Sequence, residues 1–298
     1  MAKPATFDGY DDEYTVECER MLVTLLRGLG PWKESVFLIG GLTPRYLVAA
    51  RPPDVPAHAG TLDVDIVIDL QILADMQAYQ TLEENLHKMG FERATNAEGQ
   101  KLSWRWQTRT EKGATMVLEL LADAPEIAGG RVQALPTKGK ISALNIPHSS
   151  IVFDLHQVTE LQVELLAGAG VATEQVRHAN LVSFTCLKAF AFDQRFERKD
   201  AHDLLYCIEH SPDGLAGVAK MFREALDGKH AAVVNKALMI LRSRFARDEK
   251  IEGHLKDGPV AIARFELGEG VEPEEREARL LRQRECCDLI EQLLIRIG

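Results

Sequence analysis

The pattern of hydrophobic and polar residues changes character near residue 180. Before that point, short apolar runs alternate with glycine, proline and polar residues, which is typical of strands joined by turns and a few helices. After it, apolar residues recur every three or four positions, which indicates successive helices. We therefore predict an α+β fold, with a mixed sheet and flanking helices in residues 1–180 and a helical C-terminal domain in residues 181–298.

The first half is predicted to start with a loose tail over residues 1–14, which an amphipathic helix follows at 16–29. Two further helices are expected, at about 42–50 and at 72–89. Predicted strands cover 36–39, 61–68, 91–94, 102–108, 114–121, 151–155 and 161–166, with 176–180 pairing back.

The second half begins with an almost wholly apolar segment at 181–192, which we interpret as a buried helix. The residues between 251 and 271 are rich in glycine and are expected to be irregular, except that 260–265 could be ordered. The other predicted helices span 198–206, 215–226, 231–245 and 273–297.

Two carboxylates stand out on the predicted strand at 61–68. Because side chains alternate along a strand, Asp63 and Asp65 share one face, and their α-carbons lie roughly 7 Å apart. Carboxylates this close repel each other unless a cation lies between them, and magnesium prefers such oxygen ligands. A solvated acidic face is the simpler interpretation, although aspartate is uncommon in strands.

A glycine pair follows the apolar strand at 36–39. Gly40 and Gly41 permit a tight turn in which backbone N–H groups can approach a ligand closely. The predicted helix after them would direct its positive end at the same place, and Thr43 could add a hydroxyl group. A strand, a glycine turn and a helix followed by a strand with two carboxylates could hold a nucleoside triphosphate with Mg²⁺.

A third acid lies on the predicted strand at 114–121. Glu119 stands in an otherwise apolar run, and a buried carboxylate is costly unless it is paired or bound to metal. The alternatives are that Glu119 faces solvent or pairs with Arg105, and Asp123 is the fallback candidate for the third acid.

The helical half contains one isolated charge in an apolar segment and a cluster of charges directly after it. Lys188 is the only charged residue between 181 and 192, and lysine is rarely buried without a partner, although its ammonium can reach the surface. Asp200 and Asp203 are three residues apart and therefore share a helix face. A charged helix start would explain them equally well.

Composition excludes some classes of protein and leaves others open. The net charge of −10 argues against general nucleic-acid binding, so that any RNA contact would need a local basic patch, such as Lys138–Lys140 or 104–109. Five cysteines without metal-ligand spacing indicate a reducing cytoplasm, and no apolar run is long enough to span a membrane.

The turn at Ile39-Gly40-Gly41 and the strand Asp63-Val64-Asp65-Ile66 resemble the DNA polymerase beta-like nucleotidyltransferase superfamily. Within it, the chain looks most like the AbiEii-type nucleotidyltransferases, many of which are toxins of toxin–antitoxin systems. Lys188, Arg195 and the segment 199–204 match the second half of that pattern, so the resemblance covers most of the chain.

The resemblance implies an activity and a role for each matching residue. It implies a Mg²⁺-dependent transfer of a nucleoside monophosphate from an NTP to RNA, with tRNA as the first choice and a cognate antitoxin as a partner. Two Mg²⁺ ions are expected, with Mn²⁺ as an alternative ion. The metal ligands would be Asp63, Asp65 and Glu119, with Glu119 also acting as general base. Phosphates would contact Gly40, Gly41, Thr43, Arg45 and Lys188, and Asp200, less surely Asp203, would be needed for activity.

The sequence departs from the family pattern at one position. Family members often carry an arginine just before the carboxylate strand, where this chain has Ala57-His58-Ala59-Gly60. Whether Arg45 or Arg51 substitutes for it stays open. Two other readings remain: transfer to a protein or small-molecule hydroxyl, and a catalytically silent module that binds nucleotides or a partner.

Overall fold

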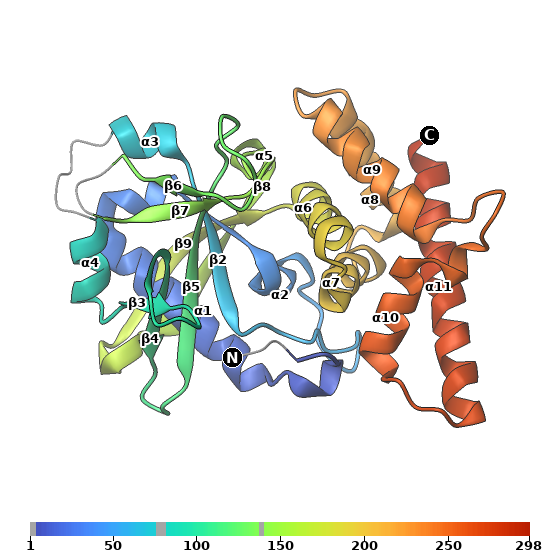
Figure 1. The fold of residues 1–298 in the computed structure, drawn as a ribbon, viewed down its shortest axis with the longest axis horizontal. Helices are drawn as coiled ribbons and strands as arrows, with labels where there is room; N and C mark the ends of the chain where they lie inside the picture. Colours follow the sequence, from blue (N-terminus) through green and yellow to red (C-terminus); the bar gives the residue numbers. More distant parts are fainter. Residues whose placement is uncertain (1–3, 76–81, 137–139) are drawn as a thin grey trace. The chain divides into compact units, whose positions relative to one another are not determined.

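A computed structural model describes residues 4–75, 82–136 and 140–298, and these residues form two compact units (Figure 1). The sheet unit consists of residues 11–43 and 60–179. The helical unit consists of the segment that ends at Tyr10, residues 44–59 and residues 180–298. The predicted strand-rich first half and helical second half therefore correspond to the two units, except that two N-terminal segments join the helical one.

The sheet unit is built on a mixed sheet whose main strand order is β3-β4-β5-β2-β1-β9-β8, with β7 beside β5 and β6 beside β7. The pairs β2–β5 and β1–β9 are parallel, whereas β1–β2, β4–β5 and β8–β9 are antiparallel. The strands are β1 (Val36–Ile39), β2 (Asp63–Ile68), β3 (Glu92–Thr95), β4 (Lys101–Arg109), β5 (Thr115–Ala122), β6 (Val132–Ala134), β7 (Ser142–Asn145), β8 (His156–Glu164) and β9 (Val171–Ala179).

One face of this sheet carries the hydrophobic core. Ile66 of β2 and Leu120 of β5 line a small internal space together with Leu25 of α1 and Leu86 of α4. All four side chains are buried, so the two helices cover this face. The helices of the unit are α1 (Asp12–Leu29), α3 (Leu70–Asp75), α4 (Leu82–Lys88) and α5 (Ile151–Asp154), with 3-10 turns η2 (Gly30–Ser35), η3 (Gly40–Leu42) and η4 (Leu166–Gly168).

The helical unit packs its helices around apolar side chains. Its first long helix starts after Asn180, whose side chain accepts a hydrogen bond from the Ser183 N–H at 3.0 Å and so caps the helix. Phe192, Phe222, Phe245 and Phe265 are among its fully buried residues. The helices are α2 (Pro44–Leu47), α6 (Leu181–Arg195), α7 (Arg198–Glu209), α8 (Gly214–Leu226), α9 (Ala231–Phe245), α10 (Asp257–Leu267) and α11 (Pro273–Ile297), with η1 (Phe7–Gly9) and η5 (Gly253–Leu255).

The predicted α+β class is confirmed, and two local predictions are wrong. Residues 151–154 form a helical turn rather than a strand, because Ser150 at its start is bonded to Asp123. The helix expected at 42–50 is reduced to η3 and the four residues of α2. The ordered part expected at 260–265 lies within α10, which is longer than expected and buries Ala261, Ile262 and Phe265. Residues 76–81 of the helix expected at 72–89, and Lys138 and Gly139 of the basic loop, lie outside the described residues.

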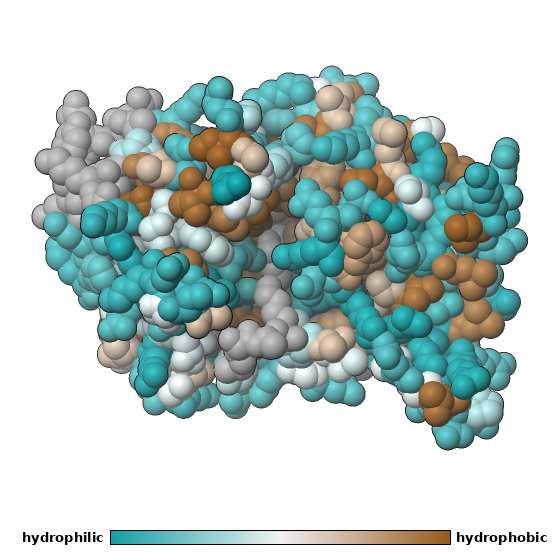
Figure 2. Space-filling model, viewed as in Figure 1, coloured by the Kyte–Doolittle hydropathy of each residue, from teal (hydrophilic) through white to brown (hydrophobic). Residues whose placement is uncertain are grey.

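The surface in the view of Figure 2 is mostly hydrophilic, and hydrophobic atoms appear there in several separate groups. Exposed large hydrophobic residues include Met239, Leu255, Val271 and Ile295. Among the described residues, no helix has the length and apolar character needed to cross a membrane. All five cysteines are buried free thiols.

Candidate active site: a carboxylate cluster on the sheet

The candidate site follows one row of residues across four neighbouring strands. Asp65 of β2 lies opposite Ile39 of β1 on one side and opposite Glu119 of β5 on the other. Glu119 in turn lies opposite Arg105 of β4. Laterally paired residues point to the same side of a sheet, so Asp65, Glu119 and Arg105 share one face.

Asp63 lies two residues before Asp65 in β2. Because residues two apart in a strand share a face, Asp63 points to the same side of the sheet as Asp65. One carboxylate oxygen from each of Asp63, Asp65 and Glu119 lies within 4.8 Å of the others. Asp63 is 6% exposed, and the other two are partly buried. Three carboxylates held this close, with oxygen as the only donor atom, fit a hard divalent cation such as Mg²⁺.

Thr61 helps to fix the orientation of the first carboxylate. Its hydroxyl donates to Asp63 Oδ1 at 3.0 Å, and its own backbone N–H donates to Thr15 Oγ1 of α1 at 3.0 Å. Both threonines are buried. The start of β2 is thereby attached to α1 by side-chain hydrogen bonds that the sequence pattern did not indicate.

Position 40 requires a glycine for two reasons, its backbone conformation and the lack of room for a side chain. Its φ of +76° lies in the left-handed region, which strongly favours glycine. A Cβ added at Gly40 would lie 2.0 Å from Asp65 Oδ2, so the carboxylate packs directly against the glycine backbone. The glycine turn and the carboxylate strand, which the sequence pattern predicts as one unit, are in contact.

The residues after Gly40 form a tight turn with an unused hydroxyl group. The Thr43 N–H donates to the Gly40 carbonyl at 3.2 Å, and Gly41 between them is buried. Thr43 Oγ1 is also buried, and it has no hydrogen-bond partner among the described residues. A buried hydroxyl without a partner is energetically costly.

Glu119 lies close both to the two aspartates of β2 and to Arg105. Glu119 joins the carboxylate cluster, and its Oε1 also lies 3.2 Å from Arg105 Nε. Asp123, the fallback, follows the end of β5 and accepts hydrogen bonds from the Ser150 N–H and hydroxyl at 3.2 and 2.5 Å. Asp123 therefore stabilises the turn before α5 through these hydrogen bonds. Glu119 is the acid that β5 contributes to the cluster.

Cys18 of α1 has a buried thiol, and the carboxylates of the cluster affect its pKa. Burial raises the pKa of the Cys18 thiol far above its usual value, and the negative charges of Asp63 and Asp65 raise it further. The thiol therefore stays neutral at physiological pH, which suits a position near the carboxylates of Asp63 and Asp65.

The other predicted site residues belong to the helical unit, where Lys188 is the centre of a buried ion-pair network. Lys188 Nζ donates to Asp200 Oδ1 at 3.0 Å and to Asp203 Oδ2 at 2.6 Å. Arg195 adds two bonds to Asp200, and Lys199 adds two to Asp203. The lone buried lysine of the sequence therefore has the two aspartates of the following helix as partners.

Each member of this network is held in its charged form. Burial, the largest single effect, would raise the pKa of Asp200 and of Asp203, but Lys188 together with Arg195 at Asp200, and with Lys199 and His58 at Asp203, lowers both, well below the usual value for Asp203. Burial would likewise lower the pKa of Lys188, but Asp203 and Asp200 raise it. All three groups are thus ionised at neutral pH, and each depends on the others.

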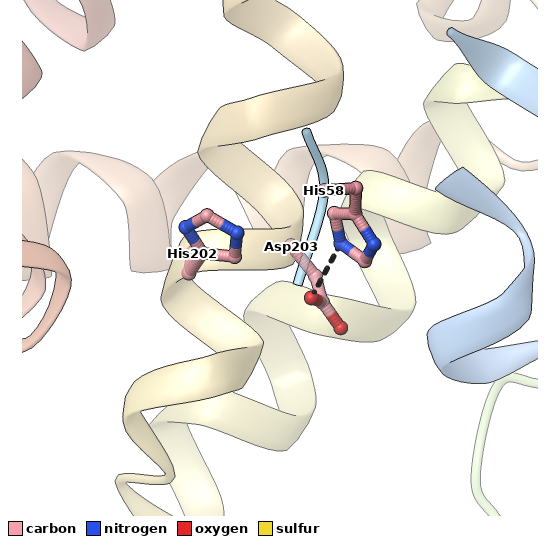
Figure 3. Close-up of side chains that lie close together, drawn as sticks. All are labelled: His58, His202 and Asp203. Atoms are coloured by element: carbon pink, nitrogen blue, oxygen red, sulfur yellow. Dashed lines mark hydrogen bonds and ion pairs between the residues drawn. The ribbon is translucent and has the colours of Figure 1, made fainter. Parts of the chain in front are cut away.

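His58 completes the network from the segment that the family pattern would fill with an arginine. Figure 3 shows its ring beside Asp203, and His58 Nε2 lies 2.9 Å from Asp203 Oδ1. The ring also stacks on His202, with centroids 5.5 Å apart. Burial holds the pKa of His58 at about 3 despite the favourable effect of Asp203, so the imidazole is neutral and donates from Nε2.

His58, His202 and Asp203 are close enough to be considered as a metal site (Figure 3). However, the two oxygens of Asp203 already accept hydrogen bonds from His58, Lys188 and Lys199, and a carboxylate has about four acceptor positions. The ammonium groups of Lys188 and Lys199, which both donate hydrogen bonds to Asp203, would also repel a divalent cation. We interpret the cluster as a buried ion-pair network in which His202 Nε2 has no hydrogen-bond partner among the residues that the structure describes.

The two arginines considered as substitutes for the missing one both lie in the helical unit. The Arg51 guanidinium donates to the backbone carbonyls of Val48, Ala50 and Arg45 at 2.5, 2.9 and 2.9 Å. The Arg51 side chain therefore stabilises the backbone between Arg45 and Ala50. Arg45 lies in α2, which is one helical turn long.

The chain was also compared with known proteins. It matches no protein-family model, and no curated protein is significantly similar to it in sequence. The carboxylate cluster and the turn that contacts it are therefore the features of the chain that bear on function.

Proposed function

We propose that the chain is a magnesium-dependent nucleotidyltransferase, which moves a nucleoside monophosphate from an NTP to a hydroxyl group of an acceptor. The observation that carries the proposal is the convergence of Asp63, Asp65 and Glu119, whose oxygens lie within 4.8 Å of one another. The Gly40 turn against Asp65 and the buried Thr43 hydroxyl without a partner support it.

In the proposed reaction, Asp63 and Asp65 would hold the metal, with Glu119 as the third oxygen ligand. Magnesium bound there would lower the pKa of the acceptor hydroxyl and neutralise the charge of the leaving pyrophosphate. The acceptor oxygen forms a bond to the α-phosphorus, the bond from that phosphorus to the bridging oxygen breaks, and Glu119 accepts the hydroxyl proton. Backbone N–H groups of Gly40 and Gly41 and the Thr43 hydroxyl would contact phosphate oxygens.

The acceptor and the biological role are proposed from the resemblance to the AbiEii-type enzymes. We propose RNA, with tRNA first, as the acceptor, and a toxin that a cognate antitoxin restrains as the role. The same resemblance assigns Lys188 to the nucleotide phosphates and makes Asp200 necessary for activity. Both assignments stay predictions beside the ion-pair roles described above.

The experiment is an incubation of the pure protein with each α-labelled NTP, Mg²⁺ and total RNA, with Asp65→Asn as the matched inactive variant. Label in RNA that disappears in Asp65→Asn supports the proposal. Label in protein or in a small molecule would show that the acceptor is that molecule and not RNA. Nucleotide binding without transfer of label would instead indicate a silent module. Growth arrest on expression, relieved by Asp65→Ala, would support the toxin role.

A further inference from the structure

One face of β4 carries three basic residues at regular intervals, which we call the basic row: Lys101, Arg105 and Arg109. They are four residues apart along the strand and therefore share a face, with neighbouring α-carbons roughly 14 Å apart. Arg105 lies opposite Glu119 of the adjacent strand β5 (Figure 1). The basic row is thus on the sheet face that carries the carboxylate cluster.

The two faces of β4 differ in exposure. Trp104 and Trp106 point to the opposite face from the basic row, where Trp106 is fully buried. On the side of the basic row, Lys101 and Arg109 are exposed and Gln107 is partly exposed. The basic residues of the segment 104–109 are therefore open to a ligand, whereas its tryptophans face away from them.

The cationic groups of the basic row can accept a further partner. Within the described part of the chain, Lys101 and Arg109 form no hydrogen bond or ion pair. Arg105 pairs with Glu119, with Nε 3.2 Å from Oε1, but its side chain is still 34% exposed. A guanidinium has five N–H donors, so this pair leaves room for a second anion.

The basic row fits the phosphate backbone of a single-stranded nucleic acid. Regularly spaced cationic groups match a chain of regularly spaced phosphates, and β4 and β5 present no aromatic side chain on this face on which bases could stack. The molecule as a whole carries a net charge of −10 and repels a polyanion, so a local basic row would determine where it binds.

We propose that the basic row binds the phosphate backbone of the RNA acceptor, as a single-stranded segment laid along β4. Arg105, which is next to Glu119 in the register, would contact the phosphate nearest the reacting nucleotide. Lys101 and Arg109 would contact phosphates further away. The choice of RNA rests on the proposed function, whereas the binding of a polyanion rests on the placement and charge of the row.

The test is the binding of a short fluorescent oligouridine RNA to the full chain, in Mg²⁺ without NTP, measured by fluorescence anisotropy at several salt concentrations. Three phosphate contacts predict a slope of about −2 for the logarithm of the binding constant against that of the salt concentration. Lys101→Gln and Arg109→Gln should each weaken binding about fivefold and make this slope shallower by about 0.7.

Two further variants test the sign and the place of the effect. Glu92 of β3 is an exposed acid opposite Gln107 on the same face, so Glu92→Gln should strengthen binding by about twofold. Lys88→Gln is the matched control, because exposed Lys88 belongs to α4, which covers the other face of the sheet. It should bind like wild type. Because no base is read, oligoadenosine and oligouridine should bind within about twofold of each other.

The transfer assay separates RNA binding from support of the carboxylate cluster. Lys101→Gln and Arg109→Gln are expected to raise the KM for RNA by about fivefold, with kcat and the KM for the NTP unchanged. Loss of kcat would instead indicate that the variants disturb the cluster. Equal urea denaturation midpoints of wild type and variants check that the fold is kept.

The inference is overturned if Lys101→Gln and Arg109→Gln bind the oligouridine as Lys88→Gln does, or if no form binds it at low salt. It is also overturned if polyglutamate displaces the RNA as effectively as unlabelled RNA does, which would indicate an acidic protein segment as the partner. RNA binding with the expected variant pattern, but without nucleotidyl transfer by any form, would uphold the surface and refute the proposed function. Transfer to RNA with an unchanged KM in both variants would do the reverse.

Discussion

Asp65 and Glu119 are register partners on the parallel strands β2 and β5, although the helices and strands of residues 70–109 separate them in the sequence. The parallel pairing places both carboxylates on one face, and Asp63 follows on the same face two residues earlier. The carboxylate cluster thus arises from strand order and register, and not from a contiguous motif.

The first prediction concerns the cost of bringing these carboxylates together. Asp65→Asn should reduce nucleotidyl transfer by about a hundredfold or more, because a metal ligand is lost. In the absence of metal it should leave the free energy of unfolding unchanged or raise it by up to about 1 kcal/mol, since one of three repelling charges is removed. Urea denaturation measures the second effect. Glu126→Gln, in an exposed turn, is the charge-matched control that should change neither quantity.

The second prediction separates the two reasons for glycine at position 40. Gly40 and Gly99 have φ values of +76° and +78°, but a Cβ at Gly99 would meet nothing within 4 Å. Gly99→Ala should therefore cost only about 1 kcal/mol of unfolding free energy, from the left-handed backbone. Gly40→Ala should cost more and should also weaken Mn²⁺ binding, because it displaces Asp65. Equal stability losses with unchanged Mn²⁺ affinity would show that Asp65 does not depend on this contact.

The third prediction concerns the buried network of the helical unit. Lys188→Met removes the shared partner of Asp200 and Asp203, and leaving buried charges with fewer partners costs about 3–5 kcal/mol. Lys220→Met is the control, since Lys220 forms an exposed pair with Glu224 at 3.7 Å and should matter by less than about 0.5 kcal/mol. Equal chemical denaturation midpoints for the two variants would contradict the account of Lys188.

The fourth prediction is a pH dependence that His58 causes. An unfolded histidine takes up a proton near pH 6.5, whereas folded His58 stays neutral until about pH 3. Between these values the unfolded state binds more protons, so the free energy of unfolding falls as the pH is lowered. From pH 7 to pH 5.5, wild type should lose about 1 kcal/mol more than His58→Gln. The same loss in both proteins would mean that His58 is protonated in the folded state.

The sequence predicted the central part of the sheet well, because its strands carry strong local signals. The apolar run 36–39, the alternation at 63–68 and the glycine pair between them each indicate their structure independently of the rest. Glu119 was identified as an acid in an apolar strand, and Arg105 was named as its alternative partner. In the structure, the Glu119 carboxylate lies close to Asp63 and Asp65 and also to Arg105, so a place in the cluster and an ion pair with Arg105 are compatible.

Other features depend on contacts that no local pattern encodes. His58 meets Asp203 across 145 residues of sequence, and Thr15 meets Thr61 across 46. The apolar segment at 151–155 has a composition typical of a strand, but the hydrogen bonds from Ser150 to Asp123 start a helical turn there. In α10, Gly258 and Pro259 lie in the first turn and Gly268 lies at the C-terminal cap, where they do little harm.

The most direct measurement of the central claim is the Mg²⁺-dependent release of pyrophosphate from NTPs in the presence of total RNA. The account predicts release by the wild-type chain that requires Mg²⁺ or Mn²⁺ and that falls to background in Asp63→Asn, Asp65→Asn and Glu119→Gln, while Glu126→Gln keeps the full rate. Release that persists in all three cluster variants, or no release with any NTP from a folded wild-type chain that binds Mn²⁺, would contradict it.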